Sequence, residues 1–208
     1  CIRHMPLLDK GEQQSLLVRI VRIFPEAKPL VEQRQKAVAR RPVGKITSAR
    51  SYEIRRRELH EIINVKVPAN SRAIAHARSY GDLRENAEYK AAKEEQAYLS
   101  ARRAELEHDL HEIKPTDFSD VVVRERVVPG CTVVLERENG QTERYHLLGL
   151  WDSVPERGII AYSTPLGELL LGSEIGDSVE LPDGDTARIA GLEPLTDELA
   201  AWVRGDEL

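Results

Sequence analysis

The sequence has few of the residues that staple small secreted domains or span membranes. Only two of its 208 residues are cysteine, Cys1 and Cys131, and their separation gives neither a disulfide framework nor the paired spacing of a zinc site. No apolar run approaches the roughly 20 residues that a membrane-spanning helix needs, and the amino terminus has no apolar core of a signal peptide. We therefore expect a cytoplasmic protein with no membrane partner.

Aromatic residues and excess positive charge are also lacking. Aromatics make up 5% of the chain, whereas 31% of its residues are charged. Long solvated helices have this composition, because their exposed faces need charged side chains while a narrow packed seam needs few large ones. The formal net charge of -5 provides no global attraction to nucleic acid, which argues against a free-standing nucleic-acid binder.

Residues 1–45 are predicted to be a helical extension followed by a linker. Apolar residues at helical spacing between positions 12 and 41, broken by a proline, indicate two short helices. A basic stretch then ends near Gly44, and we interpret it as a solvated tether, with a phosphate-binding patch as the alternative. Because the chain begins with Cys1 rather than methionine, we expect this segment to be the end of a larger region.

Residues 46–115 predict two helical arms that form a long antiparallel coiled-coil hairpin. Thr47 or Ser48 is a suitable N-cap for the first arm, and Pro68 predicts a kink or local break within it. The second arm contains no glycine or proline before Pro115. Arms of roughly thirty residues would be about 45 Å long. Apolar residues recur at every seventh position of the second arm, as a seam for an antiparallel partner requires: Ala92, Leu99, Leu106 and Ile113, with Leu110 beside them.

Residues 116–195 predict a small antiparallel β-sheet with one short helix. Asn139-Gly140 is a strong hairpin signal, because both residues tolerate left-handed conformations. A short helix is expected from Pro165 to Leu171. The tail, 196–208, includes Trp202 and is assigned no structure. Strands are expected at Val121 to Val123, Thr132 to Leu135, Arg144 to Leu148, Gly158 to Tyr162, Asp177 to Leu181 and Ala187 to Leu192, so the fold class is α+β.

The turn between the two helical arms carries the candidate site. Asp82 and Glu85 follow Gly81 and lie one helical turn apart if the second helix begins at Leu83, so both carboxylates could share a cation. The same residues also match a capping box, with Asp82 as the N-cap and Glu85 at the third helical position. The two interpretations are compatible, because a cap could hold the acids in place for a metal ion.

Three motifs in order resemble the bacterial Gre-type transcript cleavage factors. They are Gly81-Asp82-Leu83, the following Glu85-Asn86-Ala87-Glu88-Tyr89, and the block from Ser163 to Asp177 that begins Ser-Thr-Pro-Leu-Gly and ends Gly-Asp. The resemblance covers roughly Lys45 to Pro194. It implies that residues 46–115 are a coiled coil that enters the secondary channel of RNA polymerase, and that residues 116–195 are an FKBP-like domain that docks on its rim.

The resemblance also implies the chemistry. Asp82 and Glu85 would help to hold a Mg²⁺ ion shared with bacterial RNA polymerase and position the water that cuts backtracked RNA at its nascent 3′ end. Two carboxylates alone bind Mg²⁺ weakly, since this ion requires six oxygen ligands and keeps its waters otherwise. The protein would therefore be an accessory factor rather than an enzyme, with no small-molecule substrate of its own.

Other interpretations stay open because the sequence departs from the family pattern. Arg84 lies where relatives often have serine, and its charge could steer RNA phosphate or compete with the metal. A non-catalytic channel-binding inhibitor or regulator of polymerase is therefore an alternative function. A coiled-coil interaction scaffold that never enters polymerase is a weaker one.

Several side chains near the turn are candidates for RNA contact. Arg78, Arg84 and Lys90 could contact RNA or its phosphates. The cations near the turn, Arg72, Arg78, Lys90 and Lys93, could equally form helix-face pairs with Glu88, Glu94 and Glu95. Tyr80 and Tyr89 are expected to pack around the turn more often than to stack on bases.

His108 and His111 are expected to be surface residues, since no third metal ligand has suitable spacing.

Overall fold

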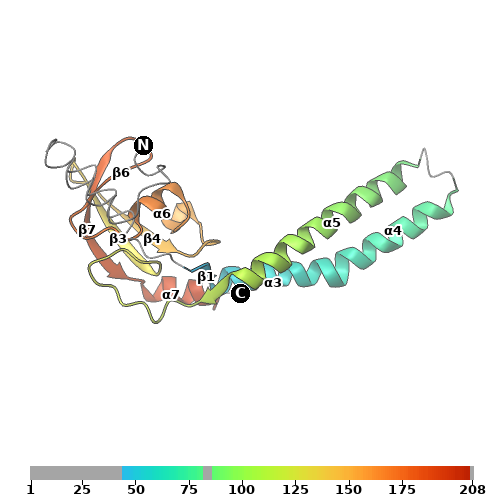
Figure 1. Cartoon of the computed structure of the whole chain (residues 1–208), viewed down its shortest axis with the longest axis horizontal. Helices are drawn as coiled ribbons and strands as arrows, with labels where there is room; N and C mark the ends of the chain where they lie inside the picture. Colours follow the sequence, from blue (N-terminus) through green and yellow to red (C-terminus); the bar gives the residue numbers. More distant parts are fainter. Residues whose placement is uncertain (1–43, 82–85, 207–208) are drawn as a thin grey trace, which may run out of the picture. The chain divides into compact units, whose positions relative to one another are not determined.

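The computed structural model describes residues 44–81 and 86–206, which belong to one compact unit, Val43–Leu208. The helices predicted between positions 12 and 41 lie outside these residues. Long helices and a mixed β-sheet are both present (Figure 1), so the predicted α+β class is confirmed. Every described helix is too short or too polar to cross a bilayer.

The first helical arm follows a short strand, β1 (Ile46–Ser48), and consists of α3 (Ala49–Glu61), the π-helical turn η3 (Ile62–Lys66) and α4 (Val67–Ser79). Ser48 is the N-cap of α3, and its hydroxyl accepts a hydrogen bond from the Ser51 amide at 3.1 Å, as its side chain predicts.

The helix continues through Pro68, where we predicted a kink or local break. Pro68 lies in the first turn of α4, directly after η3. Proline has no amide hydrogen and its ring crowds the carbonyl four residues earlier, and the wider π turn relieves this crowding while helical hydrogen bonding resumes. The irregularity predicted at Pro68 therefore occurs one turn before it and does not end the arm.

The second arm, α5 (Ala87–Glu112), lies side by side with α4 (Figure 1). The heptad residues Ala92, Leu99, Leu106 and Ile113 are all buried, as the sevenfold spacing predicted. Leu99 and Leu106 pack with Ile62 of η3 in a small apolar cluster. The arms are therefore held by a narrow seam of aliphatic side chains, which explains how so charged a segment can fold with so few aromatics.

Polar bonds between the arms show that they run antiparallel. The Tyr52 hydroxyl donates to the Leu110 carbonyl at 3.2 Å near the base of the arms, and the buried Asn70 amide donates to the Ala92 carbonyl at 2.9 Å nearer the turn. Between them, the Arg102 guanidinium forms a two-pronged pair with the Glu58 carboxylate at 2.7 and 2.9 Å. The residue numbers of the bonded partners therefore fall along the second arm as they rise along the first, as in an antiparallel pair. Supercoiling of the arms stays a prediction.

The five-stranded sheet has the strand order β5-β4-β3-β7-β6. Its strands are β3 (Cys131–Arg137), β4 (Thr142–Leu148), β5 (Ile159–Ala161), β6 (Ser178–Glu180) and β7 (Thr186–Pro194). The hairpin between β3 and β4 turns at Asn139 and Gly140 as predicted, with Gly140 at φ +81°. A separate two-stranded parallel pair joins β1 to β2 (Lys114–Thr116), which follows α5 directly.

Two expectations about the strands are wrong. Strands β4 and β5 pair in parallel, not antiparallel, after a connection that contains the 3-10 turn η4 (Pro155–Arg157). Alternation of apolar residues is the same for both directions, so the sequence pattern could not distinguish them. Val121–Val123 forms no strand, because Val121 and Val123 instead pack against two different apolar clusters.

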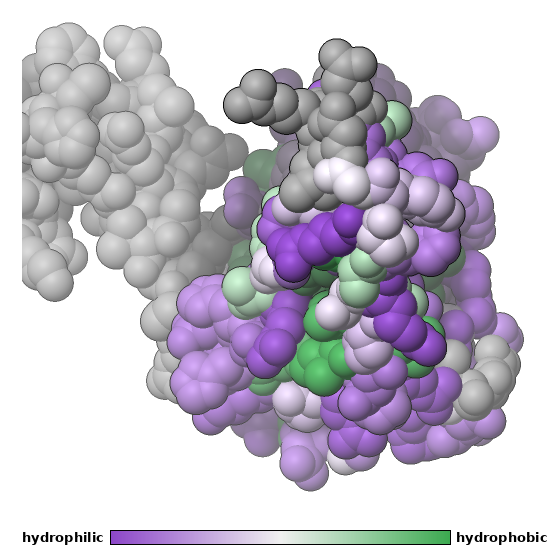
Figure 2. All heavy atoms as spheres, turned by 90° about the vertical axis from the view of Figure 1, so that its right-hand side faces the viewer, coloured by the Kyte–Doolittle hydropathy of each residue, from purple (hydrophilic) through white to green (hydrophobic). Residues whose placement is uncertain are grey.

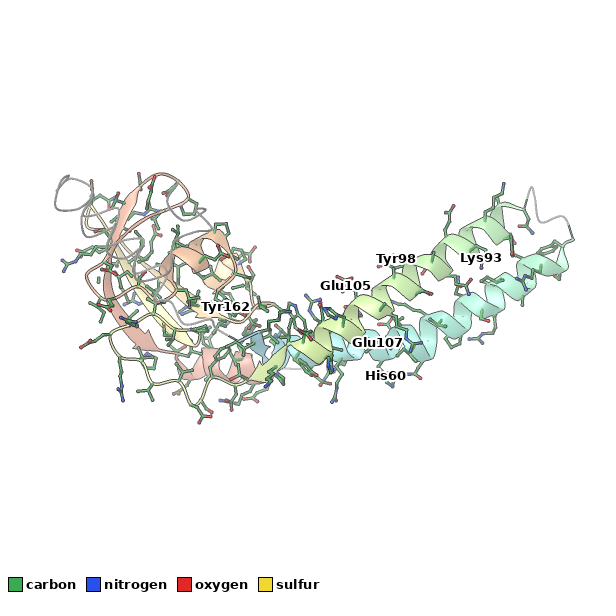
Figure 3. All side chains as sticks on the ribbon, viewed as in Figure 1. His60, Lys93, Tyr98, Glu105, Glu107 and Tyr162 are labelled. Carbon is green, nitrogen blue, oxygen red and sulfur yellow. The ribbon has the colours of Figure 1, made fainter. Side chains whose placement is uncertain are left out.

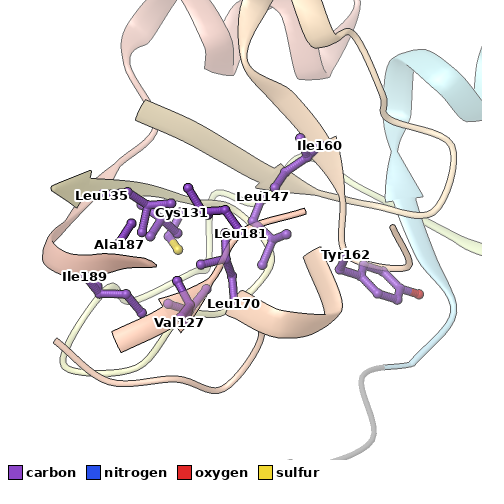
Figure 4. Packing of buried hydrophobic residues seen from close by; sticks show 12 residues of the cluster. Val127, Cys131, Leu135, Leu147, Ile160, Tyr162, Leu170, Leu181, Ala187 and Ile189 are labelled. Carbon is purple, nitrogen blue, oxygen red and sulfur yellow. The ribbon is translucent and has the colours of Figure 1, made fainter. Parts of the chain in front are cut away.

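The sheet separates two apolar clusters. The larger one lies under the short helix α6 (Pro165–Leu170), and its side chains converge in Figure 4. Leu147 belongs to this cluster, whereas the next residue of β4, Leu148, belongs to the second. Consecutive strand residues point to opposite faces, so each face of the sheet has its own core.

The carboxy-terminal tail, to which no structure was assigned, is an ordered helix. Helix α7 (Asp197–Arg204) begins at the N-cap Thr196 and buries Leu199, Trp202 and Val203 in the second cluster. The Arg50 guanidinium of α3 lies 5.0 Å from the centre of the Trp202 ring. Helix α7 therefore packs between the sheet and the base of the first arm, which gives Trp202 the structural place that the sequence left unassigned.

Candidate functional site

The first arm ends at the turn through a glycine in a left-handed conformation. Helix α4 has Tyr80 as its C-cap, and Gly81 follows at φ +95° with its amide donating to the Arg78 carbonyl at 3.3 Å. Only glycine adopts this conformation without strain, so the residue type is required where the helix stops. The acids predicted to bind Mg²⁺, Asp82 and Glu85, and the neighbouring Arg84 lie outside the described residues, and their roles stay predictions.

The second arm begins later than predicted. Helix α5 starts at Ala87 and its N-cap is Asn86, whose side-chain oxygen accepts a hydrogen bond from the Tyr89 amide at 3.0 Å. The prediction that Asp82 caps this helix is therefore wrong. An asparagine side chain can accept a hydrogen bond from an unpaired amide of the first helical turn just as an aspartate can. Asn86 lies four residues after Asp82, and the match of Asp82 and Glu85 to a capping box drew the prediction to the earlier residue.

Asn86 also joins the two arms at their far end. Its side-chain amide donates to the Ala77 carbonyl of α4 at 2.8 Å, while its oxygen caps α5. One side chain thus serves the last turn of one helix and the first turn of the other. The segment that carries the candidate acids begins after Gly81 and ends before Asn86, so hydrogen bonds of described residues hold both of its flanks.

The cations near the turn do not form the helix-face pairs that we considered. The ion pairs of the described parts of the arms lie elsewhere, and none joins these cations to Glu88, Glu94 or Glu95. Arg78 lies over the ring of Tyr89, with 5.7 Å from its guanidinium carbon to the ring centre. The other interactions are a bond from Arg72 to the Pro68 carbonyl and one from Lys93 to Gln96, and the Lys90 side chain is exposed.

The two tyrosines at the turn differ in their surroundings. Tyr89 is half-buried beneath Arg78, as expected for a residue that packs around the turn. Tyr80 is 64% exposed. Its ring meets His76 edge-on, with 5.0 Å between ring centres and planes at 90°, and its hydroxyl lies 3.3 Å from the His76 Nε2. Among the described residues the Tyr80 ring contacts His76 of its own helix, and packing of Tyr80 around the turn stays a prediction.

The opposite end of the hairpin is organised by a buried carboxylate that the sequence did not reveal. Asp152 is fully buried, and its Oδ2 accepts hydrogen bonds from the amides of Ser48 and Gly149 at 2.8 and 2.9 Å. Its Oδ1 accepts from the hydroxyls of Ser48 and Ser51. The two serines precede Asp152 by about a hundred positions, so no local motif indicates the contact.

Glycine and tryptophan residues beside Asp152 complete this base. A Cβ at Gly149 would overlap the Thr47 backbone, so this loop can approach β1 only with glycine there. Trp151 stacks on Tyr52 with 6.4 Å between ring centres, and the Arg55 guanidinium lies 4.2 Å from the Trp151 ring. The hairpin is thus fastened by buried contacts where it leaves the sheet.

Other candidate groups do not assemble a second site. His108 and His111 are both exposed, and no cluster of three or more His, Cys, Asp or Glu suited to a metal occurs in the described part of the chain. Burial raises the pKa of the Cys131 thiol, which disfavours the reactive thiolate. The surface seen from the hairpin-turn side is mostly hydrophilic, with apolar colour in a small central area (Figure 2).

Comparison with known proteins decides the family. Residues 45–114 match the family model described as "Transcription elongation factor, N-terminal", and residues 122–190 match "Transcription elongation factor, GreA/GreB, C-term". The transcription elongation factor GreA of Treponema pallidum is 38% identical over 147 residues, which cover 70% of this chain and 90% of that protein.

The chain belongs to the GreA/GreB family of transcription elongation factors. Its family resemblance was predicted from the turn motif and from the block that follows Ser163, and it is confirmed. The GreA of Borreliella burgdorferi is 36% identical over 187 residues, or 89% of this chain, but this chain spans only 20% of that relative. GreA factor homolog 1 of Thermus thermophilus aligns with 73% of this chain at 20% identity and a TM-score of 0.34, covering 99% of that structure.

Both family matches coincide with structural elements. The first spans both helical arms together with β1 and the start of β2, and the second spans β3 to β6 and ends inside β7. Helix α7 lies beyond the second match, yet it packs on α3, which lies within the first. Helix α7 therefore lies outside both matched segments, although it packs at the base of the hairpin.

Proposed function

We propose that this chain binds bacterial RNA polymerase and stimulates the polymerase to cleave backtracked RNA. Its family membership supports a role in transcription elongation. The observation that supports a site is the hairpin itself: its two antiparallel arms end at Gly81 and begin again at Asn86, and Asp82 and Glu85 lie between these two residues in sequence. Such a hairpin can reach into a channel while its base stays outside.

The two parts of the described chain divide the work in this proposal. The arms act as a coiled coil that enters the secondary channel of polymerase, and residues 116–195 act as an FKBP-like domain that docks on its rim. The buried Asp152 network and α7 support this division, because they fasten the arms to the sheet and so transmit a docked position to the distant turn. Residues 1–45 are assigned no role, and residues 196–208 contribute through α7.

The acids supply only part of a metal site. Asp82 and Glu85 offer two carboxylates, and the remaining oxygen ligands of a Mg²⁺ ion must come from polymerase, RNA phosphate and water. When bound, this ion lowers the pKa of a coordinated water and stabilises the oxygens of an in-line displacement. Hydrogen bonds of Gly81 and Asn86 hold the two flanks of the segment that carries these carboxylates. The protein is accordingly an accessory factor rather than an enzyme.

Cleavage of RNA in a purified backtracked complex tests the proposal. With the cognate polymerase and Mg²⁺, the wild-type chain should shorten the RNA faster than polymerase alone, and Asp82→Asn and Glu85→Gln should each lose about tenfold or more of this stimulation. Glu107→Gln is the matched control, because Glu107 is an exposed acid of α5 far from the turn (Figure 3) and should leave the rate unchanged.

Three results would contradict the proposal in different ways. Full stimulation by both acid variants would remove the metal role. Inhibition of elongation without any cleavage would identify a channel-binding regulator instead. Failure to co-purify with polymerase would leave an interaction scaffold as the function.

A further inference from the structure

We propose that Tyr80 is a stacking platform for the terminal base of the backtracked RNA, and that it positions the RNA 3′ end beside the turn. This inference rests on the proposed function, because it assumes that the turn reaches the RNA. The proposed role is one of positioning, because the ring would hold the RNA and would not bind the metal. Tyr80 lies two residues before Asp82 in the sequence.

The Tyr80 ring is exposed at a place where the neighbouring tyrosine is covered. Tyr80 is 64% exposed although it lies at the end of an arm where Tyr89 finds cover under Arg78. A ring that serves the turn mechanically would pack as Tyr89 does. Exposure alone does not decide the matter, because Tyr98 of α5 is 61% exposed and lies well back along the arm (Figure 3). The position and the restraint of Tyr80 distinguish it.

The restraint comes from His76, one turn earlier on α4. The edge-on ring contact at 5.0 Å and the 3.3 Å approach of the Tyr80 hydroxyl to the His76 Nε2 hold the tyrosine side chain at both its ring and its tip. A ring that is already ordered loses little conformational freedom when a base stacks on it, so the stacked state forms more readily. Every base offers a π-face, so such a platform accepts any RNA sequence.

The helix that leads to Tyr80 has no acidic side chain. Helix α4 contains no aspartate or glutamate, although 31% of the chain is charged, and its side chains include Arg72, His76 and Arg78. Helix α5, its partner, carries acids along its length. A polyanion is therefore repelled least along α4, and this is the arm that ends in the exposed ring. Phosphates near α4 and a base on Tyr80 are the arrangement that single-stranded nucleic acid adopts on basic surfaces with aromatic platforms.

The experiment places 2-aminopurine at the 3′ end of the RNA in a backtracked complex and records its fluorescence when the full chain is added. Stacking on an aromatic ring should quench the probe. The wild-type chain and Tyr80→Phe should quench it, because both keep the ring, whereas Tyr80→Ala should not. Tyr98→Ala is the matched control, since it removes an equally exposed ring away from the turn.

Cleavage rates from the same complexes provide the second readout. Tyr80→Ala should reduce the stimulated rate about tenfold, the loss expected for one stacked base, while Tyr80→Phe and Tyr98→Ala stay near wild type. Circular dichroism and polymerase co-purification should be unchanged in all three variants, because both tyrosines are exposed.

The two readouts separate this inference from the function on which it rests. Stimulated cleavage without any Tyr80-dependent quenching would overturn the stacking role and leave the proposed function in place. Tyr80-dependent quenching without stimulated cleavage would support stacking and overturn the cleavage function. Quenching that Tyr98→Ala abolishes equally, or no binding to polymerase at all, would overturn the platform.

Discussion

The base and the turn of the hairpin both contain acidic and aromatic residues, but the surroundings of these residues differ between the two ends. At the base, Asp152 is fully buried and receives four hydrogen bonds at 2.9 Å or less, and Trp202 is only 6% exposed. At the turn, Asn86 bridges the arms with one hydrogen bond, and Tyr80 is 64% exposed. Asp152 and Trp202 at the base are buried in contacts within the chain. The acids and the tyrosine that are predicted to act at the turn must instead remain accessible to a partner.

The comparison teaches that burial distinguishes structural from functional copies of a residue type. A buried carboxylate that receives hydrogen bonds from the chain itself has little capacity left for a metal. Asp152 is of this kind, because its oxygens bind amides and hydroxyls from segments about a hundred residues apart. Buried hydrogen bonds are thus concentrated where the arms leave the sheet, whereas the acids proposed to hold a metal lie in sequence between the far ends of the two arms.

The largest expected effect is at the base. Asp152→Ala orphans the buried amides of Ser48 and Gly149, and at roughly 1–3 kcal/mol for each unsatisfied donor the free energy of unfolding should fall by about 3 kcal/mol. Asp152→Asn should cost less, because its amide oxygen can serve both backbone donors while its NH₂ group donates to the serine hydroxyls. Urea denaturation measures both variants.

A control keeps the Asp152 prediction specific. Asp120 is exposed, so Asp120→Ala should change the free energy of unfolding by less than about 0.5 kcal/mol. An Asp152→Ala variant as stable as Asp120→Ala would show that the base is not the anchored end of the hairpin.

An intermediate effect is expected at the turn. Asn86→Ala removes the cap of α5 and the bond to Ala77, and loss of an N-cap typically costs about 1 kcal/mol. Because the arms end here, the loss should be local: amide hydrogen exchange should quicken in the first turn of α5 and the last turn of α4, with little change at the base. Asn86→Asp keeps the cap and loses only the donor to Ala77, so it should protect α5 but not α4. Equal exchange in both variants would contradict the joining role.

The smallest effect is expected midway along the arms. The hydrogen bonds from Arg102 lower the pKa of Glu58 below its ordinary value of 4.5, although this carboxylate is 34% exposed. The pair therefore contributes stability above pH 4.5 that is lost as the pH falls through the lower folded pKa. Glu58→Gln should reduce the free energy of unfolding at pH 7 by about 0.5 kcal/mol and make this free energy depend less on pH in the acidic range.

Thermal unfolding between pH 3 and pH 7 checks the Glu58 prediction. Glu107→Gln is again a suitable control, since Glu107 forms an exposed pair with Arg103 within one helix. If both variants lose stability with the same pH profile, then Glu58 does not link the arms.

Local chemistry alone determined several features. The sevenfold spacing of Ala92, Leu99, Leu106 and Ile113 predicted the buried seam because a helix presents such residues on one face. Asn139-Gly140 predicted its hairpin and Ser48 its cap, since each depends on the conformation or hydrogen bonding of neighbouring residues. The turn motif and the block after Ser163 also indicated the GreA/GreB family, which the comparisons confirmed.

Only the tertiary structure decided the features that depend on distant partners. The direction of β5, the role of Asp152 and the place of Trp202 each follow from contacts between segments far apart in sequence, which no local pattern records. Helix α5 likewise begins after Asn86 rather than after Asp82, and the Asn86 side chain also donates a hydrogen bond to the Ala77 carbonyl of the other arm. The sequence determined which elements form and which family they belong to, and tertiary contacts determined which of its polar and aromatic residues are buried as supports and which, like Tyr80, are left exposed.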